Sequence, residues 1–357
     1  MVSESRVDDV RVGLIGYGFA GVVFHGPLIE ATPGIRVAVV VTSDTGRAEQ
    51  ARHAHPGVRV VASANELWAR PNDVDVVVVA TANRAHVPLA RAAIAAGLPV
   101  VVEKPMAATA DEARALVAEA RARGVLLTVF QNRRWDGDFL TVTRLLAEGR
   151  LGRPLRFESR FDRWRLQPKG GWRDRGGADE AGGLLYDIGS HLIDQALQLF
   201  GPAAHVYAEM DQRRPGVEVD DDVCVAITHR SGVRSQLYMS VVNAQPGLRM
   251  RVLGSEAAYV KDGLDVQENA LKAGGVPGSA GWGEEPSDRW GLLGAADVVD
   301  RVRTEPGAYQ QFYEGLVAAL RHGAAPPVDP NDAVAALEVI DAARVSAREI
   351  RVVEVRS

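Results

Sequence analysis

A glycine-rich motif directly after the first apolar segment is the feature that most restricts how this chain can fold. Residues 10–15 are predominantly apolar, and the next six residues match the pattern G-x-G-x-x-G. These glycines allow a tight turn and let the backbone approach a pyrophosphate, which then lies at the N-terminus of the following helix. The motif therefore predicts a dinucleotide-binding unit that contacts its cofactor through Gly16, Tyr17, Gly18, Phe19 and Ala20.

Strand-like and helix-like segments alternate as far as residue 131. This alternation predicts a doubly wound parallel sheet of the Rossmann type, which we assign to residues 1–131. Ligands bind at the carboxyl ends of the strands in such a sheet. The strands are expected at residues 10–15, 35–41, 74–80, 99–102 and 126–130, and helices at 65–69, 87–96 and 111–123.

Polar residues follow two of the predicted strands at that binding edge. We assign Thr81, Asn83 and His86 after one strand, and Glu103 and Lys104 after the next, to the cofactor site. Lys104 would face the cofactor, where its amine could hydrogen-bond a bound hydroxyl. Taken alone, Lys104 fits a solvated surface position equally well.

The end of the second predicted strand bears on the choice between NAD and NADP. An acidic residue roughly 20 residues after the glycines normally binds the ribose hydroxyls of NAD. Thr42 and Ser43 occupy that place, and Arg47 follows. Their hydroxyl and guanidinium donors suit a 2′-phosphate, so we predict NADP, with NAD as the alternative. Asp44 would favour NAD if its side chain turned toward the ribose.

The pattern changes after residue 131. Grouped strands predict an α+β domain with a mostly antiparallel sheet over residues 132–357, and a chain of 357 residues is long enough for two domains. Residues 262–308 show little periodicity and are expected to form a long loop or lid. The expected strands are 155–161, 205–211, 223–228, 235–241, 249–253 and 350–355, and the expected helices are 139–148, 309–320 and 332–348.

One helix in this second half carries candidate catalytic residues. Leu185, Ile188 and Leu192 follow helical spacing and predict a buried stripe. Asp187 and His191 lie one turn apart beside it, where a histidine can be poised for proton transfer. An ordinary polar flank and a two-residue metal site are the competing interpretations.

Composition excludes several classes of function. The net charge of −5 leaves no basic excess for nucleic-acid binding, and a single cysteine, Cys224, excludes a disulfide framework. The polar start of the chain has no apolar signal-peptide core, and no apolar run reaches the roughly 20 residues of a membrane span. The cytoplasm is therefore the expected compartment.

Several motifs together resemble one family. The glycine motif, Thr81-x-Asn83-x-x-His86, Glu103-Lys104-Pro105 and Asp187-x-x-x-His191 are similar to those of the Gfo/Idh/MocA oxidoreductases. The resemblance spans nearly the whole chain. Finer features resemble the branch of NADP-dependent scyllo-inositol 2-dehydrogenases, notably the segments 132–140, 185–195 and 263–268.

The resemblance implies catalytic roles for Lys104, Asp187 and His191. His191 would take the hydroxyl proton, Lys104 would hydrogen-bond the same oxygen, and Asp187 would bind a neighbouring hydroxyl of a cyclic polyol. A hydride would pass to C4 of the nicotinamide. No metal ligand is assigned, and family members often associate through the sheet of the second domain, so a homodimer or homotetramer is expected.

Arginine and tryptophan residues after the strand at 155–161 are candidates for binding the substrate. Arg163, Trp164 and Trp172, with Arg165 and Arg173 beside them, offer ring faces and donors that suit a polyol. A packed loop with solvated arginines is the alternative for each one singly.

Three alternatives to an inositol dehydrogenase stay open. The chain could oxidise or reduce another sugar, or it could be a cofactor-binding regulator that has lost the chemistry. A metal-dependent lyase is a weaker third possibility, because Lys104 would repel a cation.

Overall fold

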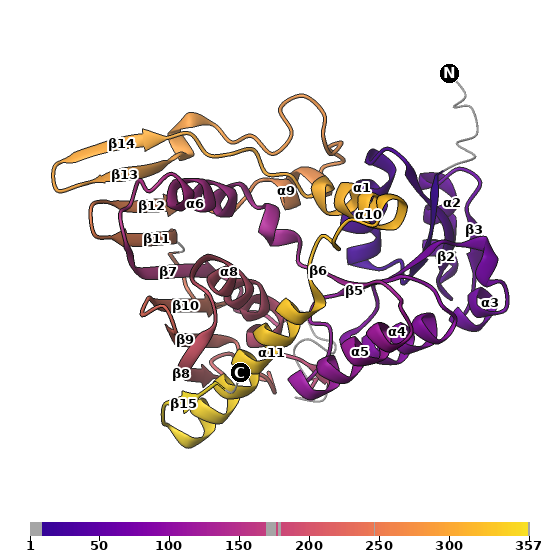
Figure 1. Ribbon diagram of the computed structural model, residues 1–357, viewed down its shortest axis with the longest axis horizontal. Coiled ribbons are helices and arrows are strands. Elements are labelled where there is room, and N and C mark those ends of the chain that lie inside the picture. The colour runs from indigo at the N-terminus through magenta and orange to yellow at the C-terminus, as the bar shows by residue number, and fades with distance from the viewer. Residues whose placement is uncertain (1–8, 169–175, 178–179, 246, 356–357) are drawn as a thin grey trace.

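The computed structural model describes residues 9–168, 176–177, 180–245 and 247–355. Two β-sheets organise these residues, one parallel and one mostly antiparallel, and they lie beside each other in Figure 1. The predicted fold class is thus confirmed. A single connected set of buried side chains runs through both halves, from Val10 to Val355.

The first sheet has six parallel strands in the order β3-β2-β1-β4-β5-β6. Valines dominate it, and all four residues of β4 are buried, because helices cover both faces of a doubly wound sheet. The strands are β1 (Val10–Ile15), β2 (Ile35–Val41), β3 (Arg59–Val61), β4 (Val76–Val79), β5 (Val100–Glu103) and β6 (Leu127–Phe130).

Short helices connect these strands. A π-helical turn, Gly21–His25, follows the glycine motif and continues directly into α1, with Pro27 in the first turn, where no N–H donor is needed. The predicted helices were close to the observed ones, whereas α2 and β3 were not anticipated. The helices are α1 (Gly26–Ala31), α2 (Thr45–Ala54), α3 (Ala64–Trp68), α4 (His86–Ala95) and α5 (Ala110–Ala122).

The second sheet has nine strands in the order β14-β13-β12-β11-β7-β10-β9-β8-β15. Only the β7–β10 pair is parallel. The strands are β7 (Pro154–Asp162), β8 (Ala203–Asp211), β9 (Asp222–His229), β10 (Arg234–Ser240), β11 (Leu248–Gly254), β12 (Ala258–Asp262), β13 (Gly291–Ala295), β14 (Val298–Val302) and β15 (Val353–Glu354).

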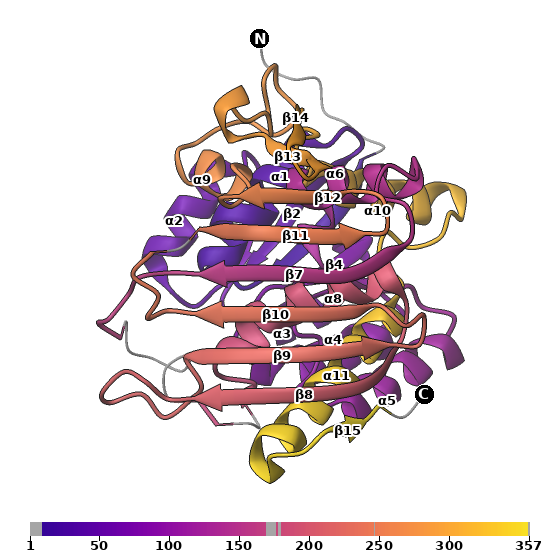
Figure 2. The ribbon, with the colours of Figure 1, turned by 90° about the vertical axis from the view of Figure 1, so that its left-hand side faces the viewer.

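Burial alternates along the central strands of this sheet. Val223, Val225 and Ile227 of β9 are buried, and the residues between them are partly exposed, which is the pattern of a sheet with one covered face. Figure 2 shows the uncovered face toward the viewer and the helices behind it. The helices of this half are α6 (Gly137–Ala147), α8 (Ser190–Phe200), α9 (Gln267–Lys272), α10 (Gln310–His322) and α11 (Pro330–Glu349).

The C-terminal helices connect the two halves. Helix α11 packs on β8 and on α5, and α10 packs on α1. Asp341 of α11 accepts a hydrogen bond from the backbone N–H of Ala110 at 2.9 Å. The elements that border the cleft between the two sheets therefore pack against each other.

Residues 262–308 contain more regular structure than the long ordered loop or lid that the sequence predicted. They contain α9 and the β13–β14 hairpin, in addition to turns. The hairpin gave no periodic signal because all five residues of β14 are exposed or only partly buried. Binary patterning detects a strand only when one of its faces is buried.

Candidate active site

A cleft of about 550 Å³ opens where the carboxyl ends of the parallel strands face the second sheet. It contains residues from the glycine motif, from the edge of the parallel sheet and from the Asp187/His191 helix, which are far apart in the sequence. The sequence-predicted residues that line it are Phe19, Ala20, Thr81, Asn83, His86, Glu103, Lys104, Arg163, Arg165, Asp187 and His191.

The helix that carries the candidate catalytic pair begins with a π-helical turn, Leu185–Gly189 (η6), and continues as α8. Leu185, Ile188 and Leu192 are buried, as the spacing predicted. Asp220 anchors its start: the side chain accepts from the Leu185 N–H at 2.7 Å, and the backbone carbonyl accepts from Leu184 at 3.0 Å. The location of Asp187 thus depends on a contact with a residue 33 positions later in the chain.

Lys104 lies against Asp187. The Lys104 Nζ donates to the Asp187 carboxylate at 3.0 Å and to its backbone carbonyl at 2.6 Å. The Lys104 side chain is 16% exposed, so the ammonium lies inside the cleft and not in bulk solvent. This contact resolves the ambiguity of the sequence, because Lys104 is not a solvated surface lysine.

His191 is almost completely buried, with 4% of its surface exposed. Its Nδ1 lies 3.1 Å from the Gln131 side-chain oxygen, so Nδ1 carries the proton in this arrangement and Nε2 keeps its lone pair. Burial, together with Lys104 and Arg133, holds the pKa of His191 well below its usual value of 6.5. The imidazole is therefore neutral at neutral pH and able to accept a proton.

Among the residues that sequence reasoning did not assign to this site, two act directly on His191. Gln131, which orients His191, follows β6 at the same edge that holds Lys104, so its place after a strand was the available signal. Arg133 lies in the cleft and pairs with Glu268 at 2.9 Å and with Asp136 at 3.3 Å. Nothing in the local sequence indicated that Arg133 would be buried.

Asp194 continues the polar stripe of the helix but does not line the cleft. It is buried and accepts two hydrogen bonds from Arg134, at 2.6 and 2.8 Å. Arg134 also pairs with Asp332 at 3.0 Å. Asp194 thus links the helix, through Arg134, to the start of α11.

The glycine motif adopts the turn that its sequence requires. Gly16 has a φ of +98°, and a Cβ there would lie 2.4 Å from the Ala80 carbonyl oxygen. Tyr17 points away from the cleft: its ring is buried, and its hydroxyl lies 2.9 Å from His55 Nε2. Any contact of Tyr17 with a cofactor would therefore involve its backbone, whereas the Phe19 side chain is 51% exposed at the cleft.

The turn after β2 presents hydroxyls and a guanidinium near the glycine motif. Asp44 caps helix α2, and its carboxylate accepts from the Arg47 N–H at 2.8 Å. The Arg47 Nη1 lies 4.0 Å from where a Cβ of Gly18 would be. Ser43 is exposed, and Thr42 accepts a hydrogen bond from the Asp44 N–H at 3.3 Å.

The remaining polar residues at the edge of the parallel sheet make contacts with the protein. His86 is buried between the carbonyls of Pro105 (2.8 Å) and Thr81 (3.2 Å). Asn83 donates to the Ala181 carbonyl at 3.0 Å, which joins the parallel sheet to the segment before the catalytic helix. These residues shape the border of the cleft.

Glu103 is also held by the protein. It lies 3.1 Å from His25 and accepts a hydrogen bond from the Lys104 N–H at 3.0 Å. Burial acts to raise the pKa of Glu103, but the hydrogen bond with His25 and the charge of Lys104 outweigh it and lower that pKa. Glu103 is therefore ionised at neutral pH and contributes a fixed negative charge beside the lysine.

The predicted substrate residues divide into two groups. Arg163 and Arg165 line the cleft, whereas Trp164 does not: it forms an isolated bridge with Val242, and 54% of its surface is exposed. Trp172 and Arg173 lie outside the described residues. Side chains alternate along an extended segment, which explains why Arg163 and Arg165 share a direction that Trp164 does not.

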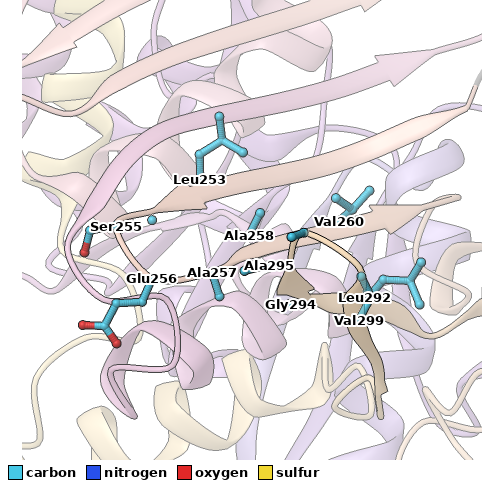
Figure 3. A pocket seen from close by; sticks show the side chains of 12 residues that line it. Leu253, Ser255, Glu256, Ala257, Ala258, Val260, Leu292, Gly294, Ala295 and Val299 are labelled. Atoms are coloured by element: carbon cyan, nitrogen blue, oxygen red, sulfur yellow. The ribbon is translucent and has the colours of Figure 1, made fainter.

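A second hollow, of about 580 Å³, lies over β11–β14 at the far end of the second sheet. Figure 3 shows Leu292 and Val299 of the hairpin beside Ala258 and Val260 of β12. Of the described side chains that line it, Glu256 alone is ionisable. This hollow therefore lacks the acid, base and cation that meet in the first cleft.

Two further searches cover the described residues. None of their helices is both long and apolar enough to cross a membrane. They also contain no group of three or more histidine, cysteine, aspartate or glutamate side chains arranged to hold a metal ion.

Comparison with known proteins gives matches over nearly the whole chain. A family model described as the NAD-binding Rossmann fold of an oxidoreductase family, GFO_IDH_MocA, matches residues 10–131. The model of the C-terminal alpha/beta domain of the same family matches residues 143–355. Together they span both sheets.

Individual relatives match over similar lengths. The chain is 41% identical over 345 residues to the uncharacterized oxidoreductase YdgJ of Escherichia coli, covering 96% of this chain and 97% of that protein. It is 34% identical to the scyllo-inositol 2-dehydrogenase (NADP(+)) IolW of Bacillus subtilis, covering 98% and 96%. The solved structure of yvaA from Bacillus subtilis superposes with a TM-score of 0.92 at 34% identity, covering 99% and 100%.

Proposed function

The chain belongs to the Gfo/Idh/MocA oxidoreductase family, and from this premise we propose that it transfers a hydride between a cyclic polyol and NADP, with inositols, scyllo-inositol first, as substrates. The observation that carries the proposal is the meeting of a neutral His191 and Lys104 in one cleft that also reaches the glycine motif. A proton acceptor, a cation and a dinucleotide-binding turn are the parts that oxidation of a hydroxyl requires.

The proton moves to His191 in the proposed reaction. His191 Nε2 accepts the proton of the substrate hydroxyl, while Gln131 holds the opposite nitrogen. Lys104 hydrogen-bonds the same oxygen and stabilises the negative charge that develops there. A bound NADP would be held by the glycine motif at Gly16 and by the turn that carries Arg47, and it would supply the hydride acceptor.

Asp187 serves two purposes in this proposal. Its carboxylate accepts a hydrogen bond from Lys104, which directs the ammonium toward the substrate oxygen. A carboxylate at the cleft can also accept a hydrogen bond from a neighbouring hydroxyl of the ring. Asp187 would thus orient both the lysine and the polyol.

The residues around the β2–α2 turn support NADP in preference to NAD. Ser43, Thr42 and Arg47 provide donors for a 2′-phosphate, and Arg47 lies beside the glycine motif. Asp44, the residue that would oppose a phosphate, is engaged as the cap of α2. The IolW relative, named for NADP(+), points in the same direction.

The two other candidates are less well supported. A silent regulator would have no need for His191 to be buried, oriented by Gln131 and kept neutral. A dehydrogenase of another sugar would use the same residues, and the YdgJ relative carries no substrate in its name. The choice of substrate is therefore the part of the proposal that most needs a direct test.

Formation of NADPH in the presence of the purified protein tests the proposal. With NADP as the cofactor, we expect the absorbance of the reduced nicotinamide to rise when scyllo-inositol or myo-inositol is added. With NAD in place of NADP, the rise should be much smaller. Common aldoses serve as the comparison set. If no inositol and no aldose is oxidised with either cofactor although the cofactor binds, the regulator is the better explanation.

A further inference from the structure

Two guanidinium groups in the cleft have no hydrogen-bond or ion-pair partner within the described residues. Arg163 and Arg165 line the cleft, and neither side chain makes a hydrogen bond or an ion pair in the described part of the chain. Phe161, Arg163 and Arg165 alternate with outward-facing residues, so they share one side of the segment that ends β7. One wall of the cleft thus carries two guanidinium groups whose N–H donors are not used by the described residues.

The other cations of the cleft are all paired. Lys104 contacts Asp187, and both Arg133 and Lys272 contact Glu268, at 3.0, 2.9 and 2.6 Å. Arg163 and Arg165 are therefore the two cations of the cleft that lack such an ion pair within the described residues. A charge without a partner is unfavourable where it is shielded from water.

The acidic residues that line the cleft are occupied as well. Asp187 and Glu268 are used by those pairs, and Glu103 is held by His25. Asp265 accepts hydrogen bonds from the backbone N–H groups of Gly137 and Gln267, both at 2.8 Å. Glu268 and Asp187 attract Arg163 electrostatically, but on the described walls of the cleft each acidic side chain makes its hydrogen bonds with other groups.

Arg163 is oriented for binding. Its guanidinium carbon lies 4.8 Å from the centre of the Phe161 ring, so the ring supports the cation without using any of its N–H donors. Arg133 lies at the same distance from the same ring. Burial lowers the pKa of Arg163 from its ordinary value, but the group remains a cation at neutral pH.

The arginines lie near the reacting end of the cleft and not near the phosphates of a cofactor. Arg163 influences His191 and Asp187 electrostatically, whereas Arg47 is the guanidinium beside the glycine motif. A ligand that reaches Arg163 is consequently the substrate. Guanidinium groups bind oxyanions in a bidentate manner, and such charge-assisted bonds are stronger than those to neutral hydroxyls.

We propose that the cleft accepts a further class of substrate, polyols that carry an oxyanion, with Arg163 and Arg165 binding that group while His191 and Lys104 face the hydroxyl to be oxidised. This inference rests on the proposed function. A carboxylate and a phosphate ester share the chemistry that the two arginines recognise. Neutral inositols would bind in the same cleft more weakly, because the two arginines would then donate to uncharged hydroxyls and not to an oxyanion.

Glucose, glucuronate and glucose 6-phosphate form a matched set of probes, because they differ only at one end of the same ring. With the enzyme saturated in NADP, we expect glucuronate or glucose 6-phosphate to show at least roughly tenfold higher kcat/KM than glucose, or a correspondingly lower inhibition constant against inositol oxidation. The two charged probes distinguish a carboxylate site from a phosphate site. Added salt, from about 20 to about 200 mM, should weaken the charged probes more than glucose.

Variants assign the preference to residues. Arg163→Gln and Arg165→Gln should each reduce the ratio between charged and neutral probes several-fold. Arg160→Gln is the matched control: Arg160 lies on β7, three residues before Arg163, but it stacks on Tyr238 and lines a different surface, so the ratio should not change. If one arginine variant fails to fold, the other variant and the salt series still decide the question.

Equal kcat/KM values, or equal inhibition constants, for glucose and both charged probes in the wild type would overturn the inference. A preference for the charged probes that survives in both arginine variants would also overturn it. Calorimetric binding of the probes to the NADP-loaded protein separates this result from failure of the proposed function. Charge-dependent binding without NADPH formation from any probe or inositol would uphold the anion site and reject the dehydrogenase. Inositol oxidation without charge-dependent binding would uphold the dehydrogenase and reject the anion site.

Discussion

At the scale of single residues, the central observation is the electrostatic surroundings of His191. The imidazole is buried, and Lys104 and Arg133 act on it as positive charges. Both effects disfavour the protonated ring, so the histidine enters the proposed reaction as a base. The same cations stabilise negative charge on a substrate oxygen, which is where an alkoxide would form.

Removing the base is the direct test of this assignment. His191→Ala should lower kcat for polyol oxidation by roughly 10²- to 10⁴-fold, the usual contribution of a positioned base. Binding of NADPH, followed by its fluorescence, should be nearly unchanged because His191 does not contact the glycine motif. Lys104→Ala should behave similarly, and near-normal turnover in His191→Ala would remove His191 from the mechanism.

The lowered pKa of His191 predicts the pH profile. Only the neutral ring accepts a proton, so kcat/KM for oxidation should fall as the pH drops through this pKa and should be level above it. Because the pKa lies well below 6.5, the fall should occur on the acidic side of that value. An acidic limb centred at pH 7 or higher would contradict the burial argument. The limb should also be absent from the residual activity of His191→Ala.

At the scale of elements, the turn between β2 and α2 is the segment on which cofactor choice depends. Its backbone is fixed by the Asp44 cap, so the side chains of residues 42, 43 and 47 are held at the edge of the parallel sheet. This arrangement follows from local sequence, since a cap and a helix start are encoded within a few residues.

Placing a carboxylate in this turn should reverse the preference. Ser43→Asp would repel a 2′-phosphate and could accept hydrogen bonds from ribose hydroxyls, so we expect the ratio of kcat/KM for NADP over NAD to fall at least roughly tenfold. Ser43→Ala is the control, which removes a donor without adding charge and should change the ratio less. A wild type that prefers NAD, or a ratio unaffected by Ser43→Asp, would show that residues 42–47 do not select the cofactor.

At the scale of the whole molecule, the uncovered face of the nine-stranded sheet stands out (Figure 2). Charged side chains lie on it: the Arg160 guanidinium stacks on Tyr238 at 3.9 Å, and Arg251 pairs with Glu158. Exposed apolar side chains gather instead on the β13–β14 hairpin, where Leu292, Val298 and Val299 lie near the second hollow (Figure 3). A mixed surface of this kind is compatible with a protein interface.

The homodimer or homotetramer remains a prediction, and it can be tested in solution. Light scattering at micromolar concentration should give two or four times the monomer mass. Val298→Asp together with Val299→Asp would place charges on the hairpin and should reduce that mass if the hairpin is part of the contact. A monomeric wild type would refute the prediction.

The sequence by itself determined the features that depend on local periodicity. Alternating strands and helices predicted the parallel sheet, glycine spacing predicted the turn at Gly16, and helical spacing placed Asp187 and His191 together. Each of these signals arises within a few residues, because turns and buried stripes are encoded by neighbours in the chain.

Only the tertiary structure decided which distant residues meet. Lys104 contacts Asp187 across 83 positions, Gln131 orients His191 across 60, and both contacts require two sheets to pack at one cleft. Within the described residues, Arg163 makes no ion pair, and this likewise depends on where the acidic side chains of the cleft are placed. Packing between elements sets these distances, and no pattern within a single element records them.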